Sequence, residues 1–359
     1  MNDPKDSPED LIVWREGALG RMRLNRPEAL NALTHAMSLE MEKALITWRE
    51  DGGVKAVLID GEGDRAFCAG GDIQYLYFTG LKDPEPGRLF WRDEYRLNAM
   101  IASYPKPYIA VMNGITMGGG VGVSAHGSHR IVTEKTMLAM PEVSIGFIPD
   151  VGGTYILSRA PGETGLYLGL SGARMNAADA IFAGFADSYV PSEVLPKLIE
   201  TFGNGEKPDV AIALISENAP DGALAALQDK IADVFSAPDI LGCMRRLDEM
   251  ADCGDEWAAK TMYMIRKNSP LAVATTFAAI HKARRLPDLE ACLELEYCYA
   301  HRALTGHEFL EGIRALVIDK DRKPDWRPAT LEEVSSEMVE SVLAPLDQTA
   351  FKWNHLKSG

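Results

Sequence analysis

The segment YIAVMNGITMGGGVG (residues 108–122) places a short apolar run directly before a cluster of glycines. The same order occurs earlier, where VKAVLI (residues 54–59) precedes the loop GEGDRAFCAGGD (residues 61–72). A short apolar run bounded by glycine is typical of a buried strand. Glycine tolerates positive φ angles and lets a ligand approach the backbone closely. We therefore predict two buried strands that each lead into a loop with accessible backbone N–H groups.

Short strands and helices alternate on both sides of these loops as far as residue 205. This alternation indicates an α/β fold. After residue 205 the apolar periodicity is mainly helical. We expect a disordered tail at residues 1–10, a core at residues 11–205 and a mainly helical C-terminal region at residues 206–359. The other strand candidates are residues 11–15, 21–24, 130–133 and 137–139, and the main helix candidates are residues 34–48 and 88–103.

The bulk composition is that of a globular protein with no general attraction to polyanions. The chain has 359 residues, of which 46% are hydrophobic and 25% charged, and its net charge is −15. Nucleic acids and anionic membranes are bound mainly through clustered Lys and Arg, so we expect neither as a partner. Five cysteines without a C-x-x-C spacing, and histidines without a metal-binding spacing, predict no disulfide framework and no metal site.

The first ten residues, MNDPKDSPED, are acidic and polar. They contain neither the apolar core of a signal peptide nor the arginine-rich character of a transit peptide. No apolar run approaches the ~20 residues that cross a bilayer. We expect a soluble cytoplasmic protein, with the mitochondrial matrix as the alternative if the source is eukaryotic.

The two glycine loops favour an oxyanion-binding site over a nucleotide site. Neither loop has the spacing of a P-loop or of a dinucleotide-binding fingerprint. Backbone N–H groups from two such loops can converge on one oxygen and stabilise the negative charge that develops there. The residues alone leave open the alternative of two tight turns without chemistry.

A pair of acidic residues, Glu142 and Asp150, lies in the segment PEVSIGFIPDVGGTY (residues 141–155). Two carboxylates can divide acid, base and nucleophile roles between them. Their apolar neighbours in the segment would raise a carboxyl pKa. The structural alternative is that Glu142 caps a helix and Asp150 forms an Asx turn.

Four segments together carry a resemblance to a known family. They resemble, in order and spacing, the conserved blocks of the enoyl-CoA hydratase/isomerase (crotonase) family. The resemblance implies a crotonase-like spiral of ββα units followed by a helical C-terminal region, with acyl-CoA bound between the glycine loops. The segments are LNRPEALNAL (residues 24–33), RAFCAGGDI (residues 65–73), NGITMGGGVG (residues 113–122) and PEVSIGFIPDVGGTY (residues 141–155).

Within that family the chain resembles the 3-hydroxyisobutyryl-CoA hydrolases. Hydratases carry a glutamate where this chain has Gly122. FWRDEYRLN (residues 90–98) and GHEFLEGIRALVIDKDRKPDWRP (residues 306–328) resemble segments of the hydrolases. The implied reaction converts 3-hydroxyisobutyryl-CoA to 3-hydroxyisobutyrate and coenzyme A in valine breakdown. Coenzyme A would be part of the substrate and no cofactor is expected. The alternatives are an enoyl-CoA hydratase/isomerase and a non-catalytic acyl-CoA-binding protein.

The resemblance also implies roles for single residues. Glu142 would be the main catalytic carboxylate, as nucleophile or as base toward water, and Asp150 would orient the substrate hydroxyl or the water. The backbone N–H groups of Gly71 and Gly119 would form the oxyanion hole. Glu94 matches a substrate-contact position. These implied substrate-binding residues are Glu94, Gly119, Glu142 and Asp150.

The coenzyme A phosphates have only weak candidates in the sequence. Many relatives carry a lysine where this chain has Glu28, so Arg26 and Arg65 are the nearest cations. Two rival nucleophiles are Ser124, in a segment that falls one residue short of a nucleophile elbow, and Cys68 beside the first glycine loop. The expected partner is the small-molecule acyl-CoA substrate, and a homo-oligomer is left open.

Overall fold

The computed structural model describes residues 10–346, 351 and 353, so the expected tail at residues 1–10 lies outside the described residues except for Asp10. Nine strands in this part of the chain form two sheets. The larger sheet is parallel except for its first, antiparallel pair, and the smaller sheet is parallel throughout. In spatial order, the larger sheet contains β1 (Leu11–Glu16), β2 (Leu19–Leu24), β3 (Ala56–Gly61), β5 (Tyr108–Met112), β7 (His129–Val132) and β9 (Ser188–Tyr189), and the smaller contains β4 (Ala66–Cys68), β6 (Ile115–Met117) and β8 (Met137–Ala139).

From β3 onward, consecutive strands alternate between the two sheets, which produces the predicted spiral of ββα units. β3 and β4 are followed by α2 (Ile73–Gly80) and α3 (Glu85–Ala102). β5 and β6 are followed by α4 (Gly119–Gly122). α4 is a single turn, because a run of glycines loses too much backbone entropy to extend a helix.

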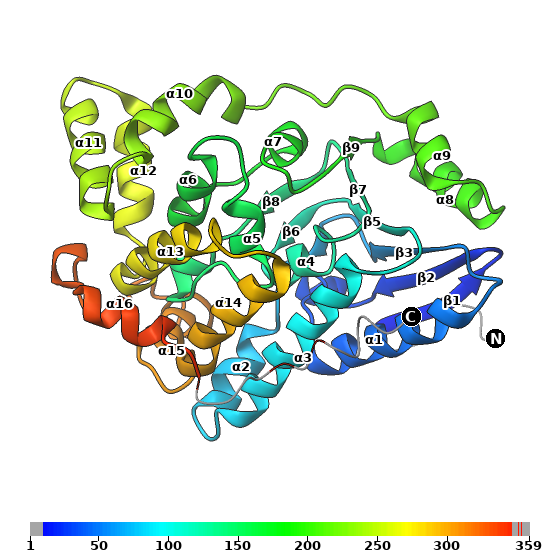
Figure 1. Ribbon diagram of the computed structural model, residues 1–359, viewed down its shortest axis with the longest axis horizontal. Helices are drawn as coiled ribbons and strands as arrows, with labels where there is room; N and C mark the ends of the chain where they lie inside the picture. Colours follow the sequence, from blue (N-terminus) through cyan, green and yellow to red (C-terminus); the bar gives the residue numbers. More distant parts are fainter. Residues whose placement is uncertain (1–9, 347–350, 352, 354–359) are drawn as a thin grey trace.

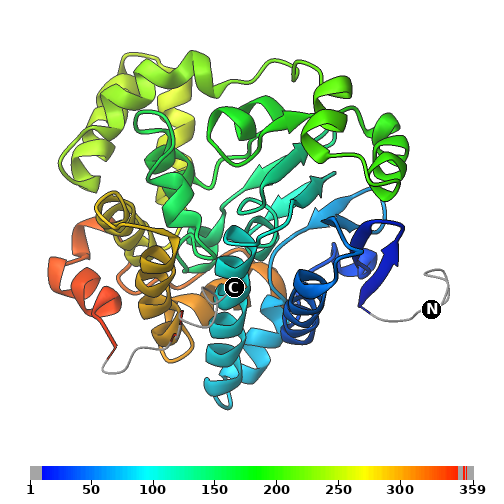
Figure 2. The same ribbon diagram turned by 45° about the vertical axis from the view of Figure 1, so that its right-hand side comes forward.

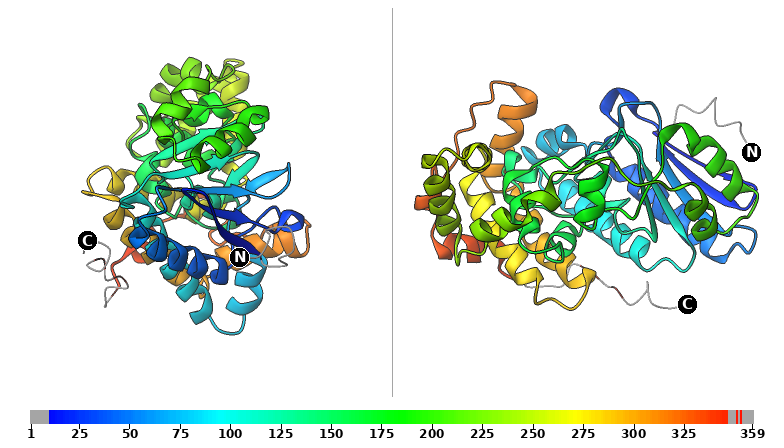
Figure 3. Two further views of the ribbon diagram at one scale, coloured as in Figure 1. Left: turned by 90° about the vertical axis from the view of Figure 1, so that its right-hand side faces the viewer. Right: turned by 90° about the horizontal axis from the view of Figure 1, so that it is seen from above.

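The larger sheet is covered on both faces, as the alternation of its side chains requires. Leu58 of β3 packs in one apolar cluster with α8 (Leu195–Gly203) and α9 (Pro208–Ile215). Val57 and Ile59 of the same strand belong to the main core, which includes α1 (His35–Glu50). Figure 3 shows α8 and α9, in green, beside the blue first strands. Helices α8 and α9, which are distant from β3 in the sequence, are thus held against it by apolar packing.

The C-terminal region is helical, as expected. Its helices α14 (Leu289–Ala303) and α15 (Glu308–Ile313) lie at the end of the spiral formed by α2 and α3, whereas α9 packs with α8 on the larger sheet (Figures 1 and 2). α14 contacts α3, and α15 contacts α2. The expected boundary after residue 205 falls between α8 and α9. None of the helices in the described part combines the length and apolar character that crossing a bilayer requires. The other helices of the C-terminal region are α10 (Leu224–Phe235), α11 (Ile240–Asp252), α12 (Glu256–Arg266), α13 (Pro270–Ala283) and α16 (Ser336–Leu343).

Candidate functional site

A cavity of about 500 Å³ lies between the spiral and the C-terminal helices. Both glycine loops, α3, the segment after β8, and α15 contribute to its wall. Its lining brings together residues that are up to 291 positions apart in the sequence, from Arg26 to Val317. All five residues for which the family resemblance implies catalytic or substrate-binding roles line this one cavity, namely Gly71, Glu94, Gly119, Glu142 and Asp150.

The two glycine loops approach each other closely at the cavity. The segment around Gly71 pairs with Leu33, through Gly70 O and the N–H of Asp72. These bonds leave the N–H of Gly71 outside the pairing. Gly119 is the first residue of α4, so its N–H has no acceptor within that helix. A Cβ added at Gly119 would lie 3.3 Å from the nitrogen of Gly71. Two backbone donors can therefore face one small space.

Three carboxyl groups share the cavity with these glycines. Glu94, Glu142 and Asp150 are each at most 6% exposed. Glu94 Oε1 and Glu142 Oε2 are buried and have no hydrogen-bond partner in the described part of the chain. Burial, and next the charge of Asp150, raise the pKa of Glu94 and of Glu142 well above the usual value. Such a cluster holds protons at pH values where exposed carboxyl groups are ionised.

Asp150 lies at the start of a turn with unusual backbone geometry. Burial raises the pKa of its carboxyl to about 7, while a hydrogen bond from the Tyr95 hydroxyl acts in the opposite direction. Val151 has φ 52° and Gly152 has φ 81°. A positive φ is rare for a β-branched residue and needs support from its surroundings. The buried Glu296 of α14 supplies support by accepting the N–H groups of Gly152 and Thr154, at 2.8 and 2.9 Å.

An aromatic cluster forms the apolar wall of the cavity. The rings of Trp91 and Phe147 stack with centroids 5.2 Å apart, and Phe309 lies 4.9 Å from Phe147. Phe309 belongs to α15, and Leu316 and Val317 of the following π-helical turn η5 (Arg314–Ile318) also line the cavity. The C-terminal region therefore forms part of the apolar wall of the cavity.

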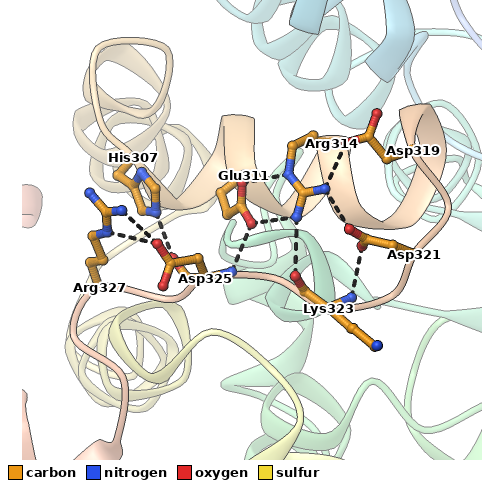
Figure 4. A network of polar contacts seen from close by, with 8 residues as sticks. All are labelled: His307, Glu311, Arg314, Asp319, Asp321, Lys323, Asp325 and Arg327. Carbon is orange, nitrogen blue, oxygen red and sulfur yellow. Dashed lines mark hydrogen bonds and ion pairs between the residues drawn. The ribbon is translucent and has the colours of Figure 1, made fainter.

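A network of charges holds the segment after α15 (Figure 4). Arg314 donates to both carboxylate oxygens of Glu311 at 2.7 and 2.8 Å, and to Asp319 and Asp321 at 2.7 Å each. It also donates to the carbonyl oxygen of Lys323 at 3.1 Å. Because Arg314 opens η5, this network fixes the turn that presents Leu316 to the cavity.

The two arginines that could bind the coenzyme A phosphates differ in their position relative to the cavity. Arg26 lines the cavity but already donates to the carbonyl of Ala32 at 2.7 Å and to Asp72 at 3.0 Å. Arg65 is absent from the cavity wall and donates to the carbonyl of Pro27. Their role toward coenzyme A phosphates stays a prediction.

Neither rival nucleophile lines the cavity. The buried Ser124 hydroxyl donates to the carbonyl of Gly120 at 2.6 Å. Burial raises the pKa of the Cys68 thiol to about 12, which disfavours the reactive thiolate. Burial lowers the pKa of His126 to about 4, and its Nε2–H donates to the carbonyl of Val151 at 2.7 Å, which is a supporting contact.

The family model described as Enoyl-CoA hydratase/isomerase matches residues 19–343. The chain belongs to the enoyl-CoA hydratase/isomerase family. Several vertebrate members of this family that resemble the chain are named 3-hydroxyisobutyryl-CoA hydrolase, mitochondrial. The protein from Xenopus laevis is 39% identical over 95% of this chain and 90% of its own length. The protein from Homo sapiens is 36% identical over 98% and 93% of the two chains. A cytoplasmic or mitochondrial location for this chain stays a prediction.

Two solved structures of the family resemble the chain throughout, and both carry other activity names. One is described as a carnitinyl-CoA dehydratase from Mycobacterium thermoresistibile, with 43% identity, a TM-score of 0.90 and coverage of 96% of this chain and 98% of that one. The other is described as an enoyl-CoA hydratase from Rhodobacter sphaeroides, with 46% identity, a TM-score of 0.89 and coverage of 94% and 98%. These two structures have the same fold as this chain. The vertebrate relatives are named as hydrolases, whereas the two structures are named as a dehydratase and a hydratase.

Two residues that support the site, Tyr95 and Glu296, were not predicted from the sequence. Tyr95 directly follows Glu94, yet no pattern in the sequence connects it with Asp150. Glu296 lies in an amphipathic helix, where a single glutamate gives no signal of burial. An alignment that revealed an invariant Tyr or Glu at these positions could have pointed to them.

Proposed function

We propose that this chain is an acyl-CoA thioester hydrolase that converts 3-hydroxyisobutyryl-CoA and water to 3-hydroxyisobutyrate and free coenzyme A, a step of valine breakdown. The observation that carries the proposal is one cavity with two converging glycine N–H groups and the pair Glu142 and Asp150. The names of the vertebrate relatives, which match over nearly the full length, support the choice of substrate.

The chemistry assigned to the cavity follows from where charge develops. The N–H groups of Gly71 and Gly119 would receive the thioester oxygen as it becomes negative, each contributing ~10²–10³ in rate. Glu142 would attack the carbonyl carbon, forming a mixed anhydride that water then opens, or would take a proton from the attacking water. In either route the C–S bond breaks and the departing thiolate takes up a proton. Asp150 would hold the substrate hydroxyl, and Glu94 would contact the acyl group.

Hydration of an enoyl-CoA is the second candidate, because both similar structures carry such names. The surroundings of Gly122 argue against it. A Cβ at this position would meet Val151 Cβ at 2.7 Å and the Asn98 amide at 2.9 Å. A second glutamate in the hydratase position therefore has no space. Any hydratase chemistry would have to use Asp150 or Glu94 in its place.

Two assays separate the candidates. The purified protein is mixed with (S)-3-hydroxyisobutyryl-CoA, and free thiol is followed with a thiol reagent. In parallel, the absorbance of the corresponding 2-enoyl-CoA is followed. We expect rapid thiol release with unchanged enoyl absorbance. Loss of enoyl absorbance without thiol release would support the hydratase, and tight binding with neither signal would support a non-catalytic acyl-CoA-binding protein.

A further inference from the structure

The carboxylate of Asp150 has a direct partner that no sequence motif assigns. The Tyr95 hydroxyl donates to Asp150 Oδ2 at 2.6 Å. Both residues are buried, and Tyr95 has no exposed surface at all. A short hydrogen bond to an ionised acceptor is among the strong ones and restricts the orientation of the acceptor.

The backbone of Asp150 is fixed independently of Tyr95. Gly153 N–H donates to the carbonyl of Asp150 at 2.6 Å, and Glu296 and His126 hold the next residues of the turn. With the backbone held, the remaining freedom of Asp150 is rotation of its side chain. Tyr95 is the group that removes this freedom.

The ring of Tyr95 is itself held in place by other rings. Tyr297 of α14 meets it edge-on at 6.1 Å, and Phe351 stacks on it at 6.4 Å. Phe351 in turn stacks on Trp353 at 4.5 Å, whose indole N–H donates to Glu294 at 2.6 Å. The hydroxyl of Tyr95 therefore points at Asp150 from a rigid support.

We propose that Tyr95 is a positioning residue that occupies one oxygen of Asp150 and aims the carboxylate at the hydroxyl of the 3-hydroxyacyl substrate. The inference rests on the proposed function, because it assumes that Asp150 binds that hydroxyl. Tyr95 does not line the cavity, so it acts through Asp150 rather than on the substrate.

The proposed role of Tyr95 predicts the direction in which the pKa of Asp150 changes when the hydroxyl is removed. A donor to a carboxylate stabilises the ionised form, so removal of the Tyr95 hydroxyl raises the pKa of Asp150. The other ionisable groups around Asp150 are carboxyls: Glu94 from α3, Glu142 from the segment after β8 and Glu296 from α14. Burial and the charge of Asp150 raise the pKa of each of these three groups. The pH dependence associated with Asp150 should therefore move to higher pH, by about one to two units for the loss of one charge-assisted bond.

The test compares Tyr95→Phe with Tyr297→Phe. Tyr297 belongs to the same ring cluster, but its hydroxyl donates to the carbonyl of Arg88 at 3.2 Å. We expect the profile of kcat/KM against pH to move upward by one to two units in Tyr95→Phe only. The preference for 3-hydroxyacyl-CoA over the plain acyl-CoA should fall about tenfold. An unmoved profile and unchanged preference in folded Tyr95→Phe would overturn the inference.

A second variant and a second readout keep the two proposals separable. Site-specific 3-fluorotyrosine at position 95 keeps the ring and strengthens the donor, so the profile should move to lower pH; no movement would count against the inference even if Tyr95→Phe failed to fold. Affinity for the 3-hydroxy-2-methylpropyl thioether of coenzyme A, measured against pH, gives the same information without turnover. Absent thiol release by the wild type would refute the proposed function alone.

Discussion

Gly119 lies so close to Glu94 that a Cβ on this glycine would come within 2.5 Å of Glu94 Oε1. The glycine is therefore required by the carboxylate on the neighbouring helix as well as by its own loop. Gly118 has a similar relationship with Glu142, whose Oε1 would lie 3.2 Å from an added Cβ. The second glycine loop and the carboxylates define each other's positions.

The first prediction concerns Gly119→Ala. The added methyl group displaces the Glu94 carboxylate and narrows the space between the glycine loops, while the backbone N–H is retained. We expect kcat to fall at least tenfold with little loss of folding. Gly52→Ala is the matched control, because nothing lies within 4 Å of its added Cβ. Equal kcat in the Gly119 and Gly52 variants would contradict the close approach.

The second prediction concerns Glu142→Gln. The amide keeps the shape but neither attacks the thioester nor accepts a proton from water. We expect a loss of roughly 10²–10⁴ in kcat, with binding of an acyl-CoA thioether retained in calorimetry. Hydrolysis at the wild-type rate would exclude Glu142 from the chemistry.

The two routes available to Glu142 differ in where oxygen from water appears. Single-turnover hydrolysis in ¹⁸O water, followed by mass spectrometry of the peptide that contains Glu142, distinguishes them. Water attack on the Glu142 carbonyl of a mixed anhydride leaves label in the protein. A base role delivers the label only to the product acid.

The third prediction concerns Asp150→Asn. The amide oxygen still accepts from Tyr95, but the group facing the cavity loses its charge. We expect kcat/KM for 3-hydroxyisobutyryl-CoA to fall roughly 10–100-fold, as for one charged hydrogen bond. The value for isobutyryl-CoA should fall less, because that substrate has no hydroxyl. A uniform loss across both substrates would show that Asp150 does not recognise the hydroxyl.

The fourth prediction links Glu296 to stability. Burial raises its pKa to about 8, whereas an unfolded glutamate titrates near ~4.3. Because the folded state then holds the proton more tightly, the free energy of unfolding falls as pH rises between these two values. Urea unfolding at pH 5, 6.5 and 8 should show a smaller fall in Glu296→Gln than in the wild type. Glu290→Gln, on the same helix and half-buried, should keep the wild-type slope; a wild-type slope in Glu296→Gln would refute the link.

The fifth prediction concerns Arg314→Met. The change removes the shared partner of Glu311, Asp319 and Asp321 and leaves their charges together. The turn that carries Leu316 should loosen, so we expect KM to rise several-fold with kcat less affected. Arg327→Met is the control, because its ion pair with Asp325 is largely exposed and does not involve Arg314. Steady-state kinetics on both variants measure the difference, and equal KM values would contradict it.

Much of the fold was predictable because its signals are local. The helix predicted at residues 34–48 is α1, which begins after Thr34, whose side chain accepts the N–H of Met37. The strand predicted at residues 108–112 is β5. Apolar periodicity, capping residues and glycine clusters act within a few residues, so they can be read without the partners they will meet.

The residue types of the site were also evident from the sequence: glycines for backbone donors and two carboxylates in one apolar segment. Which of these groups come into contact depends on the packing of the whole chain. Tyr95 reaches Asp150 across 55 positions, and Glu296 reaches the same turn across more than 140. Such contacts depend on how helices pack on the spiral, and packing is set by the whole core rather than by any short segment. For this reason the glycines and acidic residues in the sequence indicate the chemistry that this chain can carry, and the packing of α3, α14 and α15 determines where those groups lie.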